Sequence, residues 1–524
     1  MVHICNSTPA GIRSALAELP ETLDETYELT LQGIKKANWI FAHRMFQFVS
    51  VASRPLRVKE LAELLAFDFE AEPIPKFHED WRLEDPVDAV LSTCSTLLTI
   101  VDDQDSSVIQ FSHISVKEFL TSTRFAESTD IISRRYHVSM TPAHTIAARA
   151  CLGILLHLDK DVTRVNLKDY PLAEYAAEHW PDHARFEGVS QIVEDGMKQL
   201  FDPSKLHLAI CVWICDPIRG LTRRKKAPRP LPQTSLHYAA SWGLHPVVEF
   251  LIIEHSHSVS SRYPTDNATP LHLASKYGHV EAVRKLIECG ADLTAQTNDR
   301  STPLHLASQA GQVNVTRVLV EHGADLTAQN NHGSTPLHLA LEWEQVDTAR
   351  MLIERGADLA AQNNHGWTPL HLASQMGKVD IVHVLIERGA DLTAQNNHGS
   401  TPLHLALDLG QVNVARLLIE RGADITAQNR NGTTPLHFAS KRGHVHIARM
   451  LIEHGADLTA QDNRRSTPLH LASRWGQAGV VRTLIERGAD RTAQNNDGSA
   501  PLHLALQFGH QDVVRILSSA AART

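Results

Sequence analysis

The sequence predicts a mostly α-helical protein whose C-terminal half is a solenoid of about nine repeats, preceded by a smaller region of helices and one hairpin. Two observations support this prediction. The residues Thr-Pro-Leu-His at 269–272 return every 33 residues up to Thr467, continue as Ala-Pro-Leu-His from Ala500, and are preceded by Thr-Ser-Leu-His from Thr234. The first 230 residues show no such period, and 524 residues are too many for one compact core.

Each repeat carries the signals of two short helices. In one copy, Thr401 can cap the first helix, and Pro402 stands in its first turn, where a missing N–H costs nothing. Gly410 ends that helix, and the apolar residues of 412–419 form the second. The turn formers of 423–432 suit a β-hairpin finger. One such unit cannot bury its apolar face alone, so neighbouring units must stack.

A 33-residue period with the pattern T-P-L-H-x-A is typical of ankyrin repeats, which residues 233–524 resemble. The resemblance implies that the histidine of each copy is a structural hydrogen-bonding residue between adjacent units. Nine histidines are explained in this way: His237, His272, His305, His338, His371, His404, His437, His470 and His503. We therefore predict no metal site and no cofactor.

Differences between the near-identical copies indicate where a partner binds. The two positions before the helix-ending glycine vary most, and ankyrin repeats use these positions and the fingertips to face a concave groove. Trp and Arg side chains, frequent here, contribute strongly to protein interfaces. The predicted groove residues are Trp242, Tyr277, Trp343, Trp367, Met376, Leu409, Arg442, Trp475 and Phe508. The alternative is that the aromatic side chains pack against the neighbouring repeat as core.

One repeat departs from the pattern at its first helix end. Glu344 occupies the place that is glycine in every other copy. Because glycine adopts the left-handed conformation without steric cost, we expect strain at Glu344 and a weak joint in the array.

In the first third of the sequence we predict helices within 12–50, at 57–67 and at 87–94, followed by two strands within 97–113. Helices followed by a hairpin are typical of a winged-helix domain. A DNA reader needs a basic recognition helix, but the helix at 87–94 contains no lysine or arginine, so we predict no nucleic-acid partner. The predicted domains are a helical lead-in (1–37), a winged-helix-like domain (38–125), a helical spacer (126–218), a basic Pro-rich linker (219–232) and the repeats (233–524).

Several N-terminal segments resemble the region that follows the NTPase module in fungal NACHT–ankyrin proteins, which are NLR-like signalling ATPases. They include "FAHRMFQFVSVASRPLRVKELAELLAFDF", "IQFSHISVKEFLTS" and "PLAEYAAEHWPDHARF". The resemblance implies that His113 can contact nucleotide phosphates; otherwise it is a packed or helix-start histidine. No GxxxxGK[ST] phosphate loop occurs in the sequence. We expect the chain to begin where that module would end, through loss of the module or through a start recorded downstream of the true one.

Other classes of chemistry find little support. His179 and His183 lie four residues apart, but Pro181 between them argues against a regular helix. No GxSxG motif occurs, no stretch approaches the roughly 18 apolar residues of a membrane span, and the net charge is −9. Residues 204–214 resemble a degenerate first half-repeat.

We therefore predict a non-enzymatic recognition or scaffold protein that binds a protein ligand in the ankyrin groove. The resemblance implies NLR-like non-self sensing or signal-complex assembly; the alternative is a fragment of a nucleotide-switched NACHT ATPase. Scattered cysteines suit the cytoplasm, and the basic stretch Arg223–Arg229 allows nuclear import as an alternative.

Overall fold

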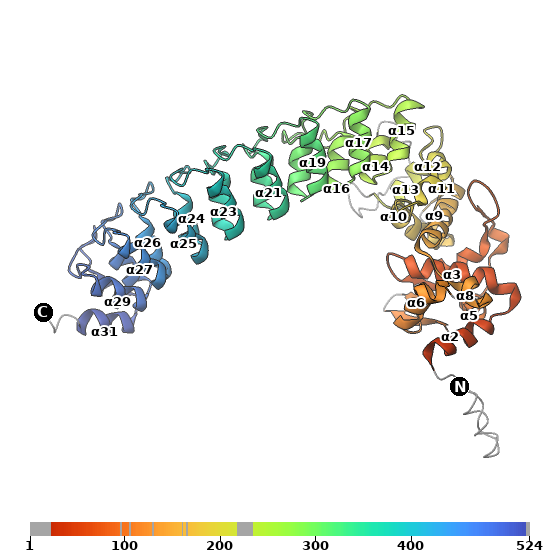
Figure 1. Ribbon diagram of the computed structural model, residues 1–524, viewed down its shortest axis with the longest axis horizontal. Helices are drawn as coiled ribbons and strands as arrows, with labels where there is room; N and C mark the ends of the chain where they lie inside the picture. Colours follow the sequence, from red (N-terminus) through yellow and green to blue (C-terminus); the bar gives the residue numbers. More distant parts are fainter. Residues whose placement is uncertain are drawn as a thin grey trace, which may run out of the picture. The chain divides into compact units, whose positions relative to one another are not determined.

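The computed structural model describes residues 22–94, 97–103, 106–127, 130–159, 161–163, 166–216 and 234–519. The chain divides into two compact units, Met1–Ser261 and Arg262–Thr524 (Figure 1). The division falls inside the predicted repeat region, so the first repeat belongs to the N-terminal unit. The predicted linker at 219–232 lies outside the described residues.

The N-terminal unit begins with the expected helices and hairpin. β4 and β5 pair antiparallel, with Leu98 opposite Phe111. β1, too short to be anticipated from the sequence, pairs with the other side of β5 and completes a three-stranded sheet. The elements of this part are α2 (Leu23–Gln32), α3 (Trp39–Val51), β1 (Leu56–Arg57), α4 (Val58–Ala62), β2 (Phe67–Asp68), β3 (Lys76–Phe77), α5 (Pro86–Cys94), β4 (Leu98–Asp103) and β5 (Ser106–Phe111).

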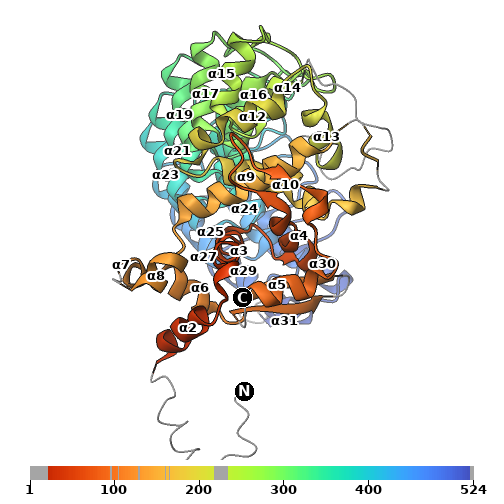
Figure 2. The same cartoon turned by 90° about the vertical axis from the view of Figure 1, so that its right-hand side faces the viewer.

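Helices follow for the rest of this unit. They are α6 (Ile114–Thr121), α7 (Thr123–Glu127), α8 (Ile131–Tyr136), α9 (Met140–His157), α10 (Leu172–Ala184), α11 (Val189–Ile192), α12 (Glu194–Phe201), α13 (His207–Ile214), α14 (Ser235–Ser241) and α15 (His245–Ile253). α9 and α10 pack against each other, and α6, α7 and α8 gather on one side of the unit (Figure 2).

The expectation that Pro181 interrupts the helix was wrong, because α10 runs through it. A proline removes one backbone donor and so frees the carbonyl four residues earlier, that of Ala177. The Cys211 Sγ lies 3.9 Å from that oxygen and is a weak substitute donor. Burial of Trp180 and Ala184 beside the proline supplies the packing that offsets the lost bond.

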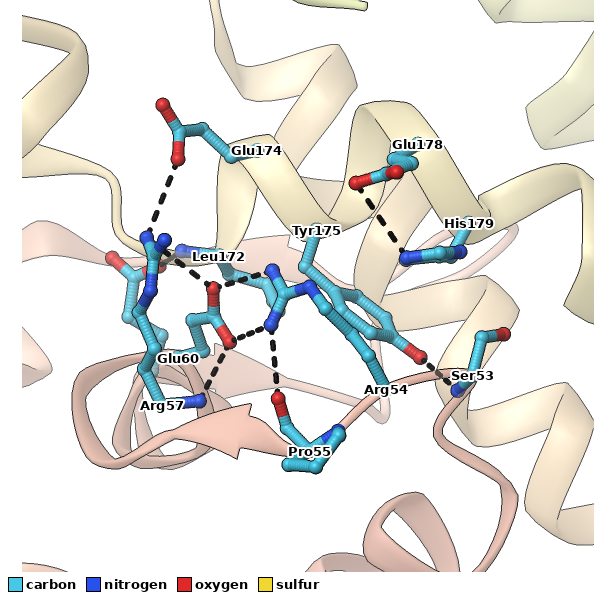
Figure 3. A network of polar contacts seen from close by, with 11 residues as sticks. Ser53, Arg54, Pro55, Arg57, Glu60, Leu172, Glu174, Tyr175, Glu178 and His179 are labelled. Atoms are coloured by element: carbon cyan, nitrogen blue, oxygen red, sulfur yellow. Dashed lines mark hydrogen bonds and ion pairs between the residues drawn. The ribbon is translucent and has the colours of Figure 1, made fainter. Parts of the chain in front are cut away.

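A polar network joins the winged-helix part to α10 (Figure 3). Arg54 donates two hydrogen bonds, of 2.8 and 2.9 Å, to the fully buried carboxylate of Glu60. Tyr175 of α10 accepts a hydrogen bond of 3.2 Å from the Ser53 backbone N–H, and the Arg54 guanidinium lies over its ring. The buried acid is thus satisfied, as a charge inside a protein must be.

The C-terminal unit is a stack of eight helix pairs within the residues described (Figure 1). The first helices are α16 (Pro270–Tyr277), α18 (Pro303–Gln309), α20 (Pro336–Glu342), α22 (Pro369–Met376), α24 (Pro402–Asp408), α26 (Pro435–Arg442), α28 (Pro468–Arg474) and α30 (Pro501–Gln507). The second helices are α17 (Val280–Glu288), α19 (Val313–Glu321), α21 (Val346–Glu354), α23 (Val379–Glu387), α25 (Val412–Glu420), α27 (Val445–Glu453), α29 (Ala478–Glu486) and α31 (Gln511–Ser519).

Each helix packs against the matching helix of the next repeat. One cluster of buried apolar residues consequently runs from Leu337 to Leu517 across successive repeats. Burying a leucine side chain contributes about 1.5–3 kcal/mol. Because many of these side chains are buried only when neighbouring repeats stack, contacts between repeats supply much of the stability of the array.

The fingers between repeats are tight turns, and no strand is assigned to them in the described repeats. The Asn330 N–H donates to the Ser334 carbonyl at 3.1 Å and closes one turn. The Asn364 N–H donates to the His332 carbonyl at 2.9 Å and links one tip to the next. The predicted β-hairpin is therefore reduced to its turn, and the fingertips form a continuous hydrogen-bonded row.

Candidate functional site

Seven of the nine histidines predicted to be structural, those from His272 to His470, have that role. The Thr302 N–H donates to Nδ1 of His305 at 3.1 Å, and Nε2 of His305 lies 3.0 Å from the Ser334 carbonyl of the next repeat. Since a backbone N–H can only donate, Nδ1 is the acceptor and Nε2 carries the proton. The arrangement recurs at His272, His305, His338, His371, His404, His437 and His470.

Most of the predicted groove residues form a row of exposed side chains that we call the variable ladder. Its members in the C-terminal unit are Tyr277, Trp343, Met376, Leu409, Arg442, Trp475 and Phe508. Met376 is half-buried; the exposed fractions of its apolar or aromatic neighbours in the row run from 37% at Tyr277 to 56% at Trp343. A side chain more than half exposed is not core, so the packing alternative fails for Trp343 and Trp475.

Trp242 was wrongly included among the groove residues. It is only 6% exposed and packs edge-to-face against Trp180 of α10 and Phe201 of α12, with ring centroids 5.5 and 5.9 Å away. The helices that precede the first repeat cover the position that later repeats leave open. Trp242 is thus a core residue of the N-terminal unit.

Trp367, Met376 and Leu409 come together around a hollow of about 630 Å³ on the C-terminal unit. Trp367 is half-buried against the repeat core, and its carbonyl accepts the hydrogen bond from Nε2 of His338 at 2.9 Å. The other lining residues are Glu342, Asn363, His365, Leu372, Gln375, His398 and Gln411. Three consecutive repeats therefore contribute to one concave site.

Sequence reasoning did not single out the histidines at this hollow. His332, His365 and His398 occupy the same fingertip position in three consecutive repeats. That run was the available signal. The TPLH histidines, which recur with the same period, mask this second run in the sequence.

The acidic residues near the ladder differ in their charge partners. Asp408 accepts hydrogen bonds of 3.2 and 2.9 Å from Arg442. Glu344 forms an ion pair of 2.6 Å with Lys378. Glu342, in contrast, forms no ion pair with any described residue.

The Glu342 carboxylate accepts a long hydrogen bond of 3.4 Å from the Ser334 hydroxyl. Its pKa is raised, chiefly because the walls of the hollow partly shield the carboxylate and so disfavour its charged form, although the residue as a whole is exposed to solvent. The Ser334 bond and the nearby His332 and His365 oppose that shift only in part. The hollow therefore holds a carboxylate that forms no ion pair with a lysine or arginine among the described residues.

Basic residues lie over aromatic rings near the other end of the ladder. The Lys441 Nζ lies 5.8 Å from the Trp475 ring centroid, and the Arg474 guanidinium lies 5.1 Å from that of Phe508. These contacts order the rings through cation–π attraction. Lys276 lies over the Tyr277 ring in the same way, so basic residues accompany both ends of the ladder, whereas the acidic Glu342 lies beside its middle.

The expected strain at Glu344 is confirmed. Its φ of 59° lies in the left-handed region, where the equivalent Gly311 and Gly377 have φ of 73° and 72°. A side chain in this conformation costs about 1–2 kcal/mol.

His113 lies at the N-terminus of α6, in the helix-start role that had been the alternative to a nucleotide contact. Its Nδ1 accepts a hydrogen bond of 3.2 Å from the Ser115 N–H and caps the helix. The Ser115 hydroxyl also bonds to the Tyr27 hydroxyl at 2.7 Å, which ties α2 to α6.

The two histidines of α10 have separate partners. His183 bonds through Nδ1 to His144 at 3.0 Å and through Nε2 to the Tyr175 hydroxyl at 2.9 Å. His179 contacts Glu178 and Asp182. Across the residues that the structure describes, no cluster of three His, Cys, Asp or Glu side chains could hold a metal ion, and no helix is long and apolar enough to cross a membrane.

Two family models match the sequence. The winged helix domain of GPI inositol-deacylase matches residues 27–131, which supports the winged-helix prediction. Ankyrin repeats match residues 206–297, 289–363, 356–429, 426–495 and 465–523. The first ankyrin match begins at 206, so it includes α13 and the predicted half-repeat.

The proteins similar to this chain include a fungal protein and a solved ankyrin-repeat structure. The azaphilone pigments biosynthesis cluster protein L of Monascus ruber is 28% identical over 292 residues, which cover 53% of this chain and 61% of that protein. The chain thus spans less than two thirds of this relative's length. The crystal structure of the ankyrin repeat domain of Bcl-3, a member of the IkappaB protein family, is 34% identical, covers 42% of this chain and all of that chain, and gives a TM-score of 0.37. Because the ankyrin matches together extend from residue 206 to residue 523, more than half of the sequence, the chain belongs to the ankyrin-repeat family.

Proposed function

We propose that this chain is a non-enzymatic scaffold that binds a protein ligand along the variable ladder. The observation that carries the proposal is the exposure of Trp343, Leu409, Trp475 and Phe508 at one repeat position. The Thr-Pro-Leu-His positions that begin the same helices, in contrast, are nearly identical between repeats and mostly buried. Large exposed apolar side chains in a row mark an interaction surface, because water contact with them is unfavourable until a partner covers them.

The length of the ladder favours a macromolecular partner. From Tyr277 to Phe508 there are seven steps of 33 residues. At a spacing of about 10 Å between packed helices, the ladder extends about 70 Å. A folded protein or a long peptide can contact such a surface, whereas a small metabolite covers only a fraction of it.

We further propose a role in NLR-like non-self sensing or signal-complex assembly. The combination of a winged-helix region at 27–131 with ankyrin repeats in one chain supports this role. In this proposal the repeats bind the ligand, and the N-terminal unit passes the signal of ligand binding to a downstream partner. A nucleotide-switched NACHT ATPase is the alternative within the same resemblance, and it requires a phosphate loop that these 524 residues do not contain.

The binding proposal is tested by a double variant, Trp343→Ala with Trp475→Ala. Ligands captured from extract of the source cells are measured for affinity against the wild type. At about 2 kcal/mol for each tryptophan, the double variant should bind several hundredfold more weakly. The matched control is Trp81→Ala, a tryptophan that is 48% exposed in the N-terminal unit. Equal binding by the folded double variant and the control would contradict the proposal.

A further inference from the structure

Glu342 differs from the acid at the same position two repeats later. Asp408 is held by Arg442 at 2.9 Å, with Lys441 4.0 Å away. The position that corresponds to Arg442 relative to Glu342 is Met376, which brings no charge. The intramolecular cation that neutralises Asp408 is thus replaced beside Glu342 by a thioether on the wall of the hollow.

The hollow also has an aromatic wall that no other described repeat of the C-terminal unit possesses. The position of Trp367 holds a small residue elsewhere: Ala268, Ser301, Ser334, Ser400, Thr433, Ser466 and Ser499. Trp367 and Glu342, a carboxylate without an ion-pair partner among the described residues, line the same hollow. An indole ring attracts cations more strongly than the other aromatic side chains.

We propose that this hollow receives a lysine or arginine side chain of the partner, with Glu342 as its counter-charge and Trp367, Met376 and Leu409 as its walls. The inference rests on the proposed function, since it specifies one anchor of the same binding surface. The long alkyl stem of a basic residue suits the Met376 and Leu409 walls, while its charged end reaches the carboxylate.

Other occupants fit less well. An acidic side chain would face the Glu342 carboxylate. A purely apolar side chain would desolvate that carboxylate further without compensation, which is costly for a charged group. A basic side chain supplies the charge that the site lacks, in the same way that Arg442 does for Asp408.

The experiment is a selection of random peptides displayed on phage against the full chain. Selected peptides are first sorted by loss of binding to the Trp343→Ala, Trp475→Ala double variant. For peptides that pass, each lysine or arginine is replaced by norleucine, which keeps the alkyl stem and removes the charge. Affinities are then measured for the wild type, for Glu342→Gln and for Asp408→Asn. The last variant is the matched control, because Asp408 has the same repeat position and already has a cation.

We expect one basic residue whose replacement weakens binding to the wild type about tenfold. The same replacement should change binding to Glu342→Gln less than about twofold, whereas Asp408→Asn should keep the tenfold difference. Trp367→Leu should reduce the lysine-over-norleucine preference without abolishing it, and it tests the aromatic wall separately. Circular dichroism confirms that each variant is folded.

The two levels of the proposal fail in different ways. Ladder-dependent peptides that contain no required basic residue, or that show the same tenfold difference on Glu342→Gln, would overturn the inference and leave the ladder as a binding surface. A selection that recovers no ladder-dependent peptide would count against both.

Discussion

Mild acid should unfold the repeats, because each TPLH histidine must be neutral to hold its neighbours together. Nδ1 accepts from the threonine N–H within the repeat, so a second ring proton would face a donor. Burial lowers the pKa of His272, His371 and His404 to about 4 from an ordinary value of 6.5. The folded state therefore binds fewer protons than the unfolded state between these values. The histidine contribution is complete above about pH 6.5 and is lost as the pH falls toward about 4.

The magnitude follows from these shifts. A histidine with a folded pKa of about 4 and an unfolded pKa of 6.5 loses about 2 kcal/mol of stabilisation between about pH 7 and about pH 5. His272, His371 and His404 together lose about 6 kcal/mol, and the other buried TPLH histidines shift in the same direction. Folded domains are stable by only about 5–15 kcal/mol, so the array should be near its unfolding midpoint at about pH 5.

The assay is urea unfolding at several pH values, followed by far-UV circular dichroism. Asp391 and Asp424 have lowered pKa values, but their contribution is lost only as the pH falls below about 4, which is outside the window from pH 7 to pH 5. Replacing His404 with Gln should reduce the pH slope by one proton. A free energy of unfolding that is unchanged between pH 7 and pH 5 would refute the reasoning, as would an unchanged slope in the variant.

Three further predictions concern single positions. Glu344→Gly should raise the free energy of unfolding by about 1 kcal/mol in urea titrations, because the strain energy that it relieves exceeds the stabilisation lost with the exposed Lys378 ion pair. The control is Glu344→Ala, which keeps the strain and loses the ion pair, and which should not be more stable than the wild type. Trp242→Ala should lower the free energy of unfolding of the N-terminal unit by about 3–5 kcal/mol, because Trp242 is buried, whereas Trp343→Ala should change stability by less than about 0.5 kcal/mol. Similar losses of stability in the two variants would show that burial does not distinguish these tryptophans. His113→Ala should lower the melting temperature, because loss of the α6 cap costs about 0.5–2 kcal/mol. His113→Ser should restore the melting temperature, since serine also caps helices. A serine variant as unstable as the alanine variant would argue against the capping role.

Local and periodic features were predictable from the sequence. The 33-residue spacing determines the repeat boundaries because each Thr-Pro pair starts a helix through its own backbone chemistry, independently of distant residues. The strain at Glu344 was predictable for the same reason, since a helix end that is glycine elsewhere requires a positive φ. The hairpin of β4 and β5 followed from its alternating apolar residues and its central turn.

Only the tertiary structure decided which repeated positions are free. Trp242 and Trp475 are equivalent in the repeat, yet Trp180 and Phe201, which lie outside the periodic pattern, bury the first. The continuation of α10 through Pro181 likewise depends on tertiary packing, because the buried residues around the proline offset the loss of its backbone N–H donor. Whether Glu342 is neutralised depends on the side chain 34 residues later, where Met376 takes the place that Arg442 has beside Asp408. The sequence by itself therefore determined the repeat and its variable ladder, while contacts between distant segments decided which side chains remain available to a partner.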